Sequence, residues 1–397
     1  MVGASLACAL AQTRLTVAIV ESVPFAANEQ PSFDQRTVAL TYGSRLIFEG
    51  LAVWTHIAEQ GAFPILRIHV SDRGHLGVTR LDHTLVGTEA LGYLVPHRTI
   101  GNILYQHVRA NPNATLFSPA RAVDVNPEES HVEAIIDDNG TTRRLRGRVI
   151  VIADGGCSEL ASQLGFRVTH TPYRKAALVG TIDVDRDHHG TAYERFTSNG
   201  PLALLPMSAR RYALVWTLPE TDAKDVLSLS NEGYVERLQE SFGGRAGCFS
   251  QPGSRHLYSL SLRQVTSLDR HRMVVIGNAA HTLHPVAGQG FNLGLRDVAV
   301  LAETFGDAEV RSIDIGKRNV LNGYARQRQR DTRAAVTFTH GLISLFTNRS
   351  LPFVIARNVG LVGIDLLPPV KRTLLRRTMG LYGRRSRLAL GLPLRGD

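Results

Sequence analysis

The sequence predicts an α/β protein in which a parallel, doubly wound unit carries an inserted antiparallel sheet and a helical C-terminal region. Three observations support this prediction. The chain opens with a helix–strand–acid pattern at 2–21, strand-like segments fill 178–262, and a strand, a glycine-rich loop and a helix follow at 273–297. With 397 residues, 43% of them apolar, the chain can bury a core large enough for two or three subdomains.

The first elements are a helix of small and apolar residues at 2–11 and a buried strand at 15–20 that ends in Glu21. This pattern is the second half of a Rossmann βαβ unit, in which the acid binds ribose hydroxyls. The first strand and two glycines of the fingerprint are absent, and Gly3 takes the place of the third glycine. A start assigned at an internal Met is favoured over a truly shortened protein, because loss of a central strand exposes strand edges and apolar faces.

The middle of the chain alternates between strands and helices. Strand patterns at 66–95 precede a helix at 98–109, a hairpin at 123–137 and a buried strand at 148–153 that ends in Asp154-Gly155. From 178 to 262 the pattern is strand-rich with one helix at 231–242, which indicates an antiparallel substrate-binding layer.

The segment after the strand at 273–276 combines a glycine-rich loop with a helix start. It reads GNAAHTLHPVAGQGFNLGLRD over 277–297. Free backbone N–H groups at a helix amino end suit an anion or an electron-rich ring. Glycines at 288, 290 and 294 let a flat cofactor approach the backbone closely.

This segment is similar to the second flavin-binding motif of the aromatic-ring hydroxylases, the single-component FAD monooxygenases. Asn278 stands where the family pattern has Asp, and an amide can still hydrogen-bond a ribityl hydroxyl. Within the family, the motif resembles the ubiquinone-biosynthesis branch, which hydroxylates polyprenyl methoxyphenols. The segments at 192–206 and 351–380 resemble the same branch, so that the similarity covers nearly the whole chain.

The resemblance implies FAD, with NAD(P)H as electron donor, and transfer of oxygen from O2 to an activated phenol through a C4a-hydroperoxyflavin. The residues expected to bind FAD are Gly3, Glu21, Arg36, Arg98, Asp154, Gly155, Gly277, Asn278, Ala279, Pro285, Gly288, Gln289, Gly290, Phe291 and Asn292. His284 and Pro285 are expected beside the reacting flavin. An apolar substrate wall of Phe196, Leu204, Leu205, Pro206 and Trp216 would suit a polyprenylated phenol. A small charged benzoate would need a fixed Arg, for which Arg195 and Arg211 are available.

Other chemistries are disfavoured. The motifs contain no nucleophile–base pair and no carboxylate dyad, and His281 and His284 lack a third ligand, so that no metal site is expected. Three widely spaced cysteines give no disulfide framework and favour a reducing cytosol. No uncharged apolar run reaches the length of a membrane span.

The C-terminal region is strongly basic. Residues 350–397 carry nine Lys/Arg against two Asp, within a chain of net charge +10. Nucleic acid is disfavoured because no nucleic-acid-binding signature accompanies the charge. Basic and apolar residues at helical spacing fit either an anionic membrane surface or a helix docked on its own domain. We expect a cytoplasmic protein, peripheral on the inner face of the membrane, with a possible place in a ubiquinone-biosynthesis assembly.

The predicted domains are discontinuous. Residues 1–65, 96–165 and 267–340 form the FAD-binding domain, 66–95 and 166–266 the substrate-binding sheet, and 341–397 a basic amphipathic helical region. The main functional hypothesis is a ubiquinone-pathway hydroxylase. The alternatives are a related flavoprotein acting on another phenol, a flavin reductase of prenyl chains, and a catalytically silent subunit that acts as a scaffold.

Overall fold

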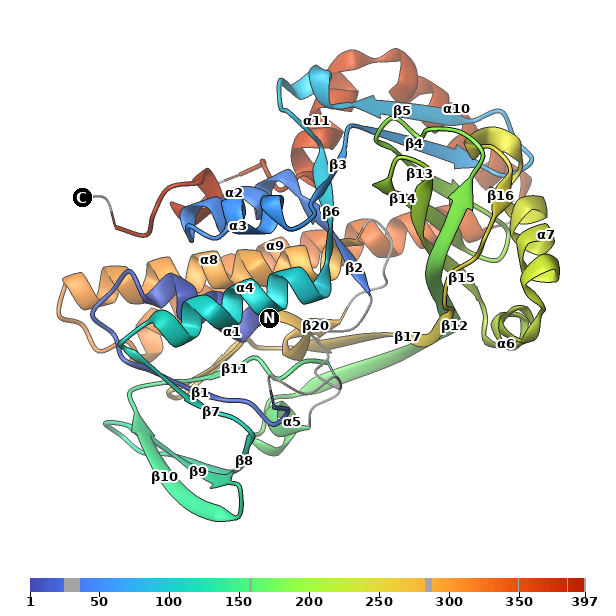
Figure 1. Cartoon of the computed structure of the whole chain (residues 1–397). Coiled ribbons are helices and arrows are strands. Elements are labelled where there is room, and N and C mark those ends of the chain that lie inside the picture. Colours follow the sequence, from blue (N-terminus) through green and yellow to red (C-terminus); the bar gives the residue numbers. More distant parts are fainter. Residues whose placement is uncertain (25–35, 157–158, 283–287, 349, 384, 396–397) are drawn as a thin grey trace.

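The computed structural model describes residues 1–24, 36–156, 159–282, 288–348, 350–383 and 385–395. Two long helices run across the middle of the molecule, with a large sheet at one end and smaller sheets at the other (Figure 1). The main hydrophobic core surrounds these helices, and a second core lies between the large sheet and two outer helices.

The parallel unit is present in two pieces. β1 (Val17–Val20) pairs with β7 (Ala114–Phe117), and β11 (Ile150–Ile152) pairs with β19 (Met273–Val275), both in parallel; β18 (Asp269–Arg270) is antiparallel to β19. No ladder joins the two pieces within the described residues. The predicted Rossmann-like elements, a helix followed by a strand in a parallel pair, are confirmed.

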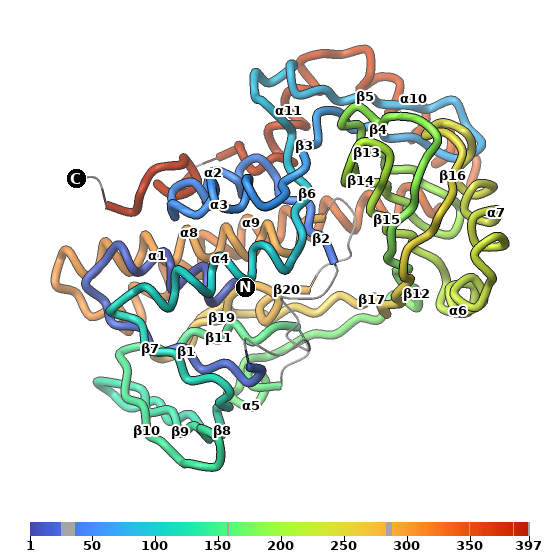
Figure 2. The backbone as a smooth tube through the Cα atoms, viewed as in Figure 1, coloured from blue at the N-terminus to red at the C-terminus, as the bar shows by residue number. Residues whose placement is uncertain are grey.

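The long helices form a buried layer. α8 (Gln289–Val310) packs against α1 (Val2–Leu10) and against α9 (Arg318–Thr347). α8 is apolar on most of its circumference, which is expected of a helix covered on several sides. α4 (His97–Ala110) lies on α1, close to it in both views (Figures 1 and 2).

Two small sheets flank the parallel unit. β2 (Thr37–Thr41), β6 (Gly92–Pro96) and β3 (Phe63–Ile65) form one beside α2 (Tyr42–Gly50) and α3 (Trp54–Glu59). β6 therefore lies outside the large sheet, although the sequence grouped 66–95 with it. The predicted hairpin at 123–137 is part of a three-stranded antiparallel meander. Its strands are β8 (Ala120–Pro127), β9 (Val132–Asp138) and β10 (Thr141–Gly147).

The large sheet confirms the predicted antiparallel layer, and its role in binding substrate stays a prediction. Its order is β20-β17-β12-β15-β14-β13-β4-β5, with β16 paired to β12, and β13 runs parallel to β4. The strands are β4 (Arg67–Asp72), β5 (Val78–Asp82), β12 (Val168–Val184), β13 (Thr191–Phe196), β14 (Pro201–Ser208), β15 (Arg211–Pro219), β16 (Phe249–Ser250), β17 (His256–Val265) and β20 (His281–Thr282). α6 (Glu220–Ser228) and α7 (Asn231–Phe242) cover one face; the short α5 (Leu160–Gln163) precedes the sheet.

The C-terminal region is helical, as predicted. α10 (Leu351–Leu366) lies against β5, and α11 (Pro368–Thr378) follows it at a sharp bend. The chain then returns to the parallel unit, where Leu388 and Leu394 join the main core. The apolar residues of the basic region are thus divided between core and surface, because Leu375 and Leu388 are buried whereas Leu366 and Val370 are exposed.

Candidate active site

Two glycine-containing turns lie close to Gly3, in the first turn of α1. A Cβ at Gly3 would lie 3.4 Å from Ala153 Cβ, at the carboxyl end of β11. The Met1 amino group interacts electrostatically with Glu21, which follows β1. The amino end of α1 therefore lies between the carboxyl ends of two parallel strands, which is where open α/β sheets bind ligands.

The turn at Gly277 contacts the same place. A Cβ at Gly277 or Gly294 would lie 3.0 Å from a methyl of Val2, and Gly277 has φ +62°. Gly277–Ala279 forms a 3-10 turn that leaves Asn278 exposed. A Cβ at Gly156 would lie 2.6 Å from Thr282 Oγ1, so that the turn after Asp154-Gly155 contacts this segment directly.

The amino end of α8 is the fourth component. Gly288 precedes it in the left-handed conformation (φ +59°), and no side chain caps the helix. A Cβ at Gly290 would come within 3.9 Å of Asn278 Oδ1. The first N–H groups of α8, including those of Gln289, Gly290 and Phe291, thus begin beside the exposed amide of Asn278. Such an end stabilises negative charge.

Asn292 fixes α8 to the small sheet. Its Nδ2 donates to the Ala39 carbonyl oxygen (2.8 Å) and to that of Gly288 (2.6 Å), and its Oδ1 accepts from the Thr41 N–H (2.8 Å). The structure therefore gives the Asn292 side chain a positioning role: it holds the glycine loop against β2.

Asp297 is a buried junction beneath the Gly277 turn. Its Oδ2 accepts from the Gly277 N–H (2.9 Å) and lies 2.8 Å from His281 Nε2, while Oδ1 accepts from Arg328 Nε (2.6 Å). Burial alone would raise the pKa of Asp297, but the charges of His281 and Arg328 outweigh burial and lower it to about 2. The carboxylate is therefore a fixed anion that links α8, α9 and the turn at Gly277.

The remaining predicted cofactor residues lie on different elements. Arg36 precedes β2, with its guanidinium carbon 5.3 Å from the centre of the Tyr258 ring on β17. Arg98 is exposed in the first turn of α4. His284 and Pro285 lie outside the described residues, so that their placement beside the flavin stays a prediction.

The predicted substrate wall is partly wrong, because neighbouring strand residues point to opposite faces. Leu204 pairs with Leu214, and both are buried with Trp216 in the core under α6 and α7. Leu204 and Trp216 therefore pack the core. Leu205 and its partner Ala213 lie on the opposite face of the sheet.

Phe196 and Pro206 also differ from the prediction. Phe196 stacks on Phe346 of α9, with ring centres 3.7 Å apart and planes at 15°. Leu361 of α10 completes that cluster, so that Phe196 joins the sheet to the C-terminal helices. Pro206 is buried, and because side chains alternate along β14 it lies on the same face as Leu204.

The face that carries Leu205 has features that the sequence did not reveal. Ala203, Val215 and Val179 form a half-buried apolar row across β14, β15 and β12. Glu194 lies opposite Ala203 on the same face. The hydroxyl of Thr217 and the Oε1 of Glu194 are buried without a hydrogen-bond partner among the described residues. Burial raises the pKa of Glu194 to about 7.

Of the two arginines considered for a charged substrate, Arg211 lies on this face and Arg195 on the opposite one. Arg195 follows Glu194 in β13, so that its side chain points to the other face of the sheet. There its guanidinium lies over Phe242 of α7 and donates to Ser71 Oγ (3.1 Å). Arg211 forms a bidentate pair with Asp183 on the neighbouring strand. The described part of this face thus combines an apolar row, the Glu194 carboxyl and the Arg211–Asp183 ion pair.

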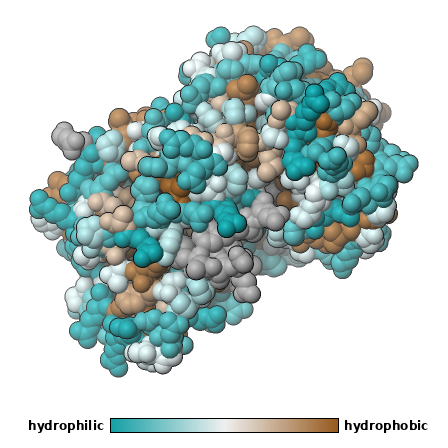
Figure 3. Space-filling view, in the orientation of Figure 1, coloured by the Kyte–Doolittle hydropathy of each residue, from teal (hydrophilic) through white to brown (hydrophobic). Residues whose placement is uncertain are grey.

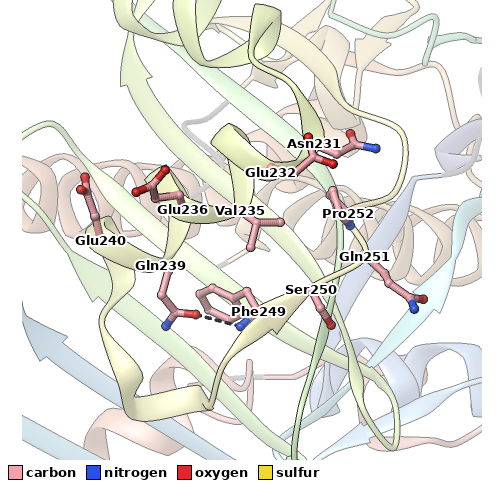
Figure 4. Close-up of a pocket in the computed structure, with 10 residues that line it drawn as sticks. All are labelled: Asn231, Glu232, Val235, Glu236, Gln239, Glu240, Phe249, Ser250, Gln251 and Pro252. Atoms are coloured by element: carbon pink, nitrogen blue, oxygen red, sulfur yellow. Dashed lines mark hydrogen bonds between the residues drawn. The ribbon is translucent and has the colours of Figure 1, made fainter.

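A groove on the outer side of the molecule is remote from these residues. It lies between α7 and the segment 249–252, and its lining includes Val235, Gln239, Phe249 and Pro252 (Figure 4). Gln239 Oε1 accepts from the Phe249 N–H (2.8 Å) across its floor. The motif residues lie on the opposite side of the large sheet.

Comparison with known proteins agrees with the geometry. The family model described as FAD binding domain matches residues 1–339. The chain belongs to this family. Ubiquinone hydroxylase UbiL of Rhodospirillum rubrum is 33% identical, over 99% of this chain and 91% of that protein. Ubiquinone hydroxylase UbiM of Neisseria meningitidis is 29% identical, over 95% and 82%. The crystal structure of p-nitrophenol 4-monooxygenase PnpA from Pseudomonas putida superposes with a TM-score of 0.78 at 17% identity, over 97% and 96%, and shows the same fold.

The predicted family, the FAD cofactor and the flavoprotein hydroxylase class are confirmed. The residues present fit the cofactor, because the glycines at 3, 277 and 288 let the amino ends of α1 and α8 and the turn at Gly277 pack closely around the exposed Asn278. The two helix amino ends there suit a pyrophosphate and an electron-rich ring. The role of each residue toward FAD stays a prediction.

Proposed function

We propose that this FAD-dependent monooxygenase hydroxylates a prenylated phenol, a polyprenyl methoxyphenol, in ubiquinone biosynthesis, with NAD(P)H and O2 as co-substrates. The observation that carries the proposal is the apolar row of Ala203, Val215 and Val179 beside Glu194, whose Oε1 has no hydrogen-bond partner among the described residues. The names of the relatives from Rhodospirillum rubrum and Neisseria meningitidis support the pathway.

Bound FAD would activate O2, and the protein positions the reactants, stabilises charge and excludes water. The amino end of α1 at Gly3, the turn at Gly277 and the amino end of α8 after Gly288 would hold the cofactor. The uncapped amino end of α8 stabilises negative charge that develops next to it. Leu205, Val215 and their neighbours exclude water from the oxygen-transfer step.

Glu194 is suited to take the proton of the substrate hydroxyl. Its pKa of about 7 leaves a substantial fraction ionised at neutral pH, and its Oε1 has no competing partner among the described residues. Transfer of the phenol O–H proton to the carboxylate leaves a phenolate, whose oxygen donates electron density to the ring carbons. The unpaired carboxyl also disfavours a benzoate, because two carboxylates would repel each other.

We further propose that the protein is cytoplasmic and peripheral on the inner face of the membrane, and that it works within a ubiquinone-biosynthesis assembly. The basic region at 350–397 supports this localisation, since anionic lipid attracts Lys and Arg near its surface. A prenylated substrate is itself confined to lipid or to a carrier, which favours the same placement.

The test uses purified protein with its flavin, NAD(P)H and a short-chain prenyl methoxyphenol, and product is identified by mass spectrometry. We expect one added oxygen per molecule of product. In Glu194→Gln we expect kcat to fall about 100-fold, with loss of the rise in rate that wild type shows as pH passes about 7. Glu240→Gln, an exposed glutamate on α7, serves as the control. A protein without flavin absorbance, or flavin-bound protein with no oxygenated product, would refute the proposal.

A further inference from the structure

α10 is oriented with its polar residues inward. Arg357 is buried, and its Nε donates to Asp72 Oδ2 of β4 (2.7 Å). Asn358 donates to the same oxygen (3.1 Å) and accepts from the Gly77 N–H (2.8 Å). The Thr79 hydroxyl donates to the Leu361 carbonyl oxygen (2.7 Å). α10 is thus attached to the β4–β5 hairpin largely by charged and polar contacts.

The outward face of the same helix is apolar. Val359 is 66% exposed and Leu366 72% exposed. Other large side chains on this outer face or just after it are also exposed: Leu351, Phe353, Ile355, Val362, Leu367 and Val370. A helix on a water-exposed surface has the opposite polarity, and exposed apolar patches of this kind mark interaction sites.

α11 adds positive charge next to this face. The segment Pro368–Thr378 contains four Lys/Arg and no acid, and Arg372, Arg376 and Arg377 are exposed. Lys371 pairs with Asp365 at the bend between the helices (2.7 Å). Brown, hydrophobic atoms are visible along the upper edge of the molecule, where α10 and α11 lie (Figure 3).

Length and composition separate this pair from the other helices. Among the described residues no single helix passes the criteria for a membrane span, whereas α10 and α11 together do so with a bend of 100°. A bend of this size, with arginines on the second arm, favours a pair that lies in the lipid interface over one that crosses the bilayer.

We propose that α10 and α11 form a lipid-docking surface, in which the apolar face of α10 enters the headgroup boundary of an anionic bilayer and the arginines of α11 contact lipid phosphates. Two features favour lipid over a second copy of the chain. The charge is of one sign and would repel its own copy, and the apolar residues have no polar groups among them that would require specific partners. This surface is only one part of the basic region at 350–397, because Leu375 and Leu388 of that region are buried in the protein.

The experiment is flotation of the full-length flavoprotein with vesicles of phosphatidylethanolamine and phosphatidylglycerol, compared with vesicles of phosphatidylcholine alone. We expect tighter binding to the anionic vesicles, weakened by salt. The double variant Val359→Asp/Leu366→Asp should bind at least about tenfold more weakly. Val310→Asp is the matched control, since Val310 is 70% exposed at the end of α8. It should bind as wild type does.

A second measurement tests insertion directly. A tryptophan placed by Val359→Trp should be quenched by brominated lipid, whereas one placed by Val310→Trp should not. The proposal is overturned if wild type fails to float with anionic vesicles or if the double variant binds as tightly as wild type. Loss of a dimer in the double variant, with no vesicle binding by wild type, would assign the face to a second copy instead.

Discussion

Replacing Asp297 by asparagine removes the charge from the junction beneath the Gly277 turn and keeps its size. The carboxylate accepts from the Gly277 N–H and from Arg328 Nε, and it lies against His281. An amide has one acceptor oxygen, so that its NH2 must face one of these donors. The variant therefore loses a hydrogen bond as well as a charge, and Arg328 loses one of its two carboxylate partners.

The magnitude follows from the pKa and from burial. Lowering the pKa of Asp297 from 3.8 to about 2 corresponds to about 2–3 kcal/mol of stability. Removing one partner of a buried pair costs more, about 3–5 kcal/mol. For a chain of 397 residues, 1 kcal/mol corresponds to about 1 °C in Tm, so that Tm should fall by about 4–6 °C.

Calorimetry of wild type, Asp297→Asn and Asp183→Asn checks this reasoning. Asp183 pairs with Arg211 on a partly exposed strand, and its loss should cost about 1 kcal/mol or less. A group whose pKa is lowered by folding stabilises above its unfolded pKa, so that the difference between wild type and Asp297→Asn should shrink as pH falls from about 4 towards about 2. A Tm within about 1 °C of wild type at pH 7 would refute the assigned role.

Two further predictions concern stability and cofactor binding. Because the pKa of Glu194 is raised to about 7, the free energy of unfolding should fall by up to about 3 kcal/mol as pH rises from about 4.5 through 7. Glu194→Gln should remove that fall. If urea unfolding gives the same pH dependence of stability for wild type and Glu194→Gln, the reasoning is contradicted. Gly288→Ala places a Cβ at φ +59°, 3.2 Å from Ala39 Cβ, and should cost about 1–2 kcal/mol and weaken FAD binding in a fluorescence titration. Gly323→Ala, a helical position with open space around it, should be neutral or stabilising, and similar losses in both variants would contradict the reasoning.

Motif and local pattern predicted much of the fold. The helices at 98–109 and 231–242 occur as α4 and α7, and the described parts of the segment at 277–297 form the expected turn and helix. These segments have strong local signals, such as glycines with positive φ and regular apolar spacing. β10 was missed because its residues, TTRRLRG, are polar and mostly exposed, so that no apolar alternation marks them.

The orientation of side chains was the main failure. Leu204 and Leu205 are adjacent in an apolar run, and sequence alone does not say which of them faces the core. Pairing with Leu214 decides this, and that pairing depends on residues ten positions away. The same limit applied to α10, where polarity predicts two faces but not which of them turns inward; Asp72, far away in the sequence, decides it.

Elements far apart in the sequence pack against each other, and this affects how the chain folds during synthesis. α1 packs against α8, and the large sheet combines β4 with β13 and ends at β20. Neither the core around α1 nor the large sheet can therefore form completely until residues beyond 280 have left the ribosome. During synthesis the apolar side of α1, which carries Leu6 and Leu10, would be exposed until α8 has been made. We expect nascent chains to engage a holding chaperone over most of their length, and fragments that stop before α8 to be insoluble.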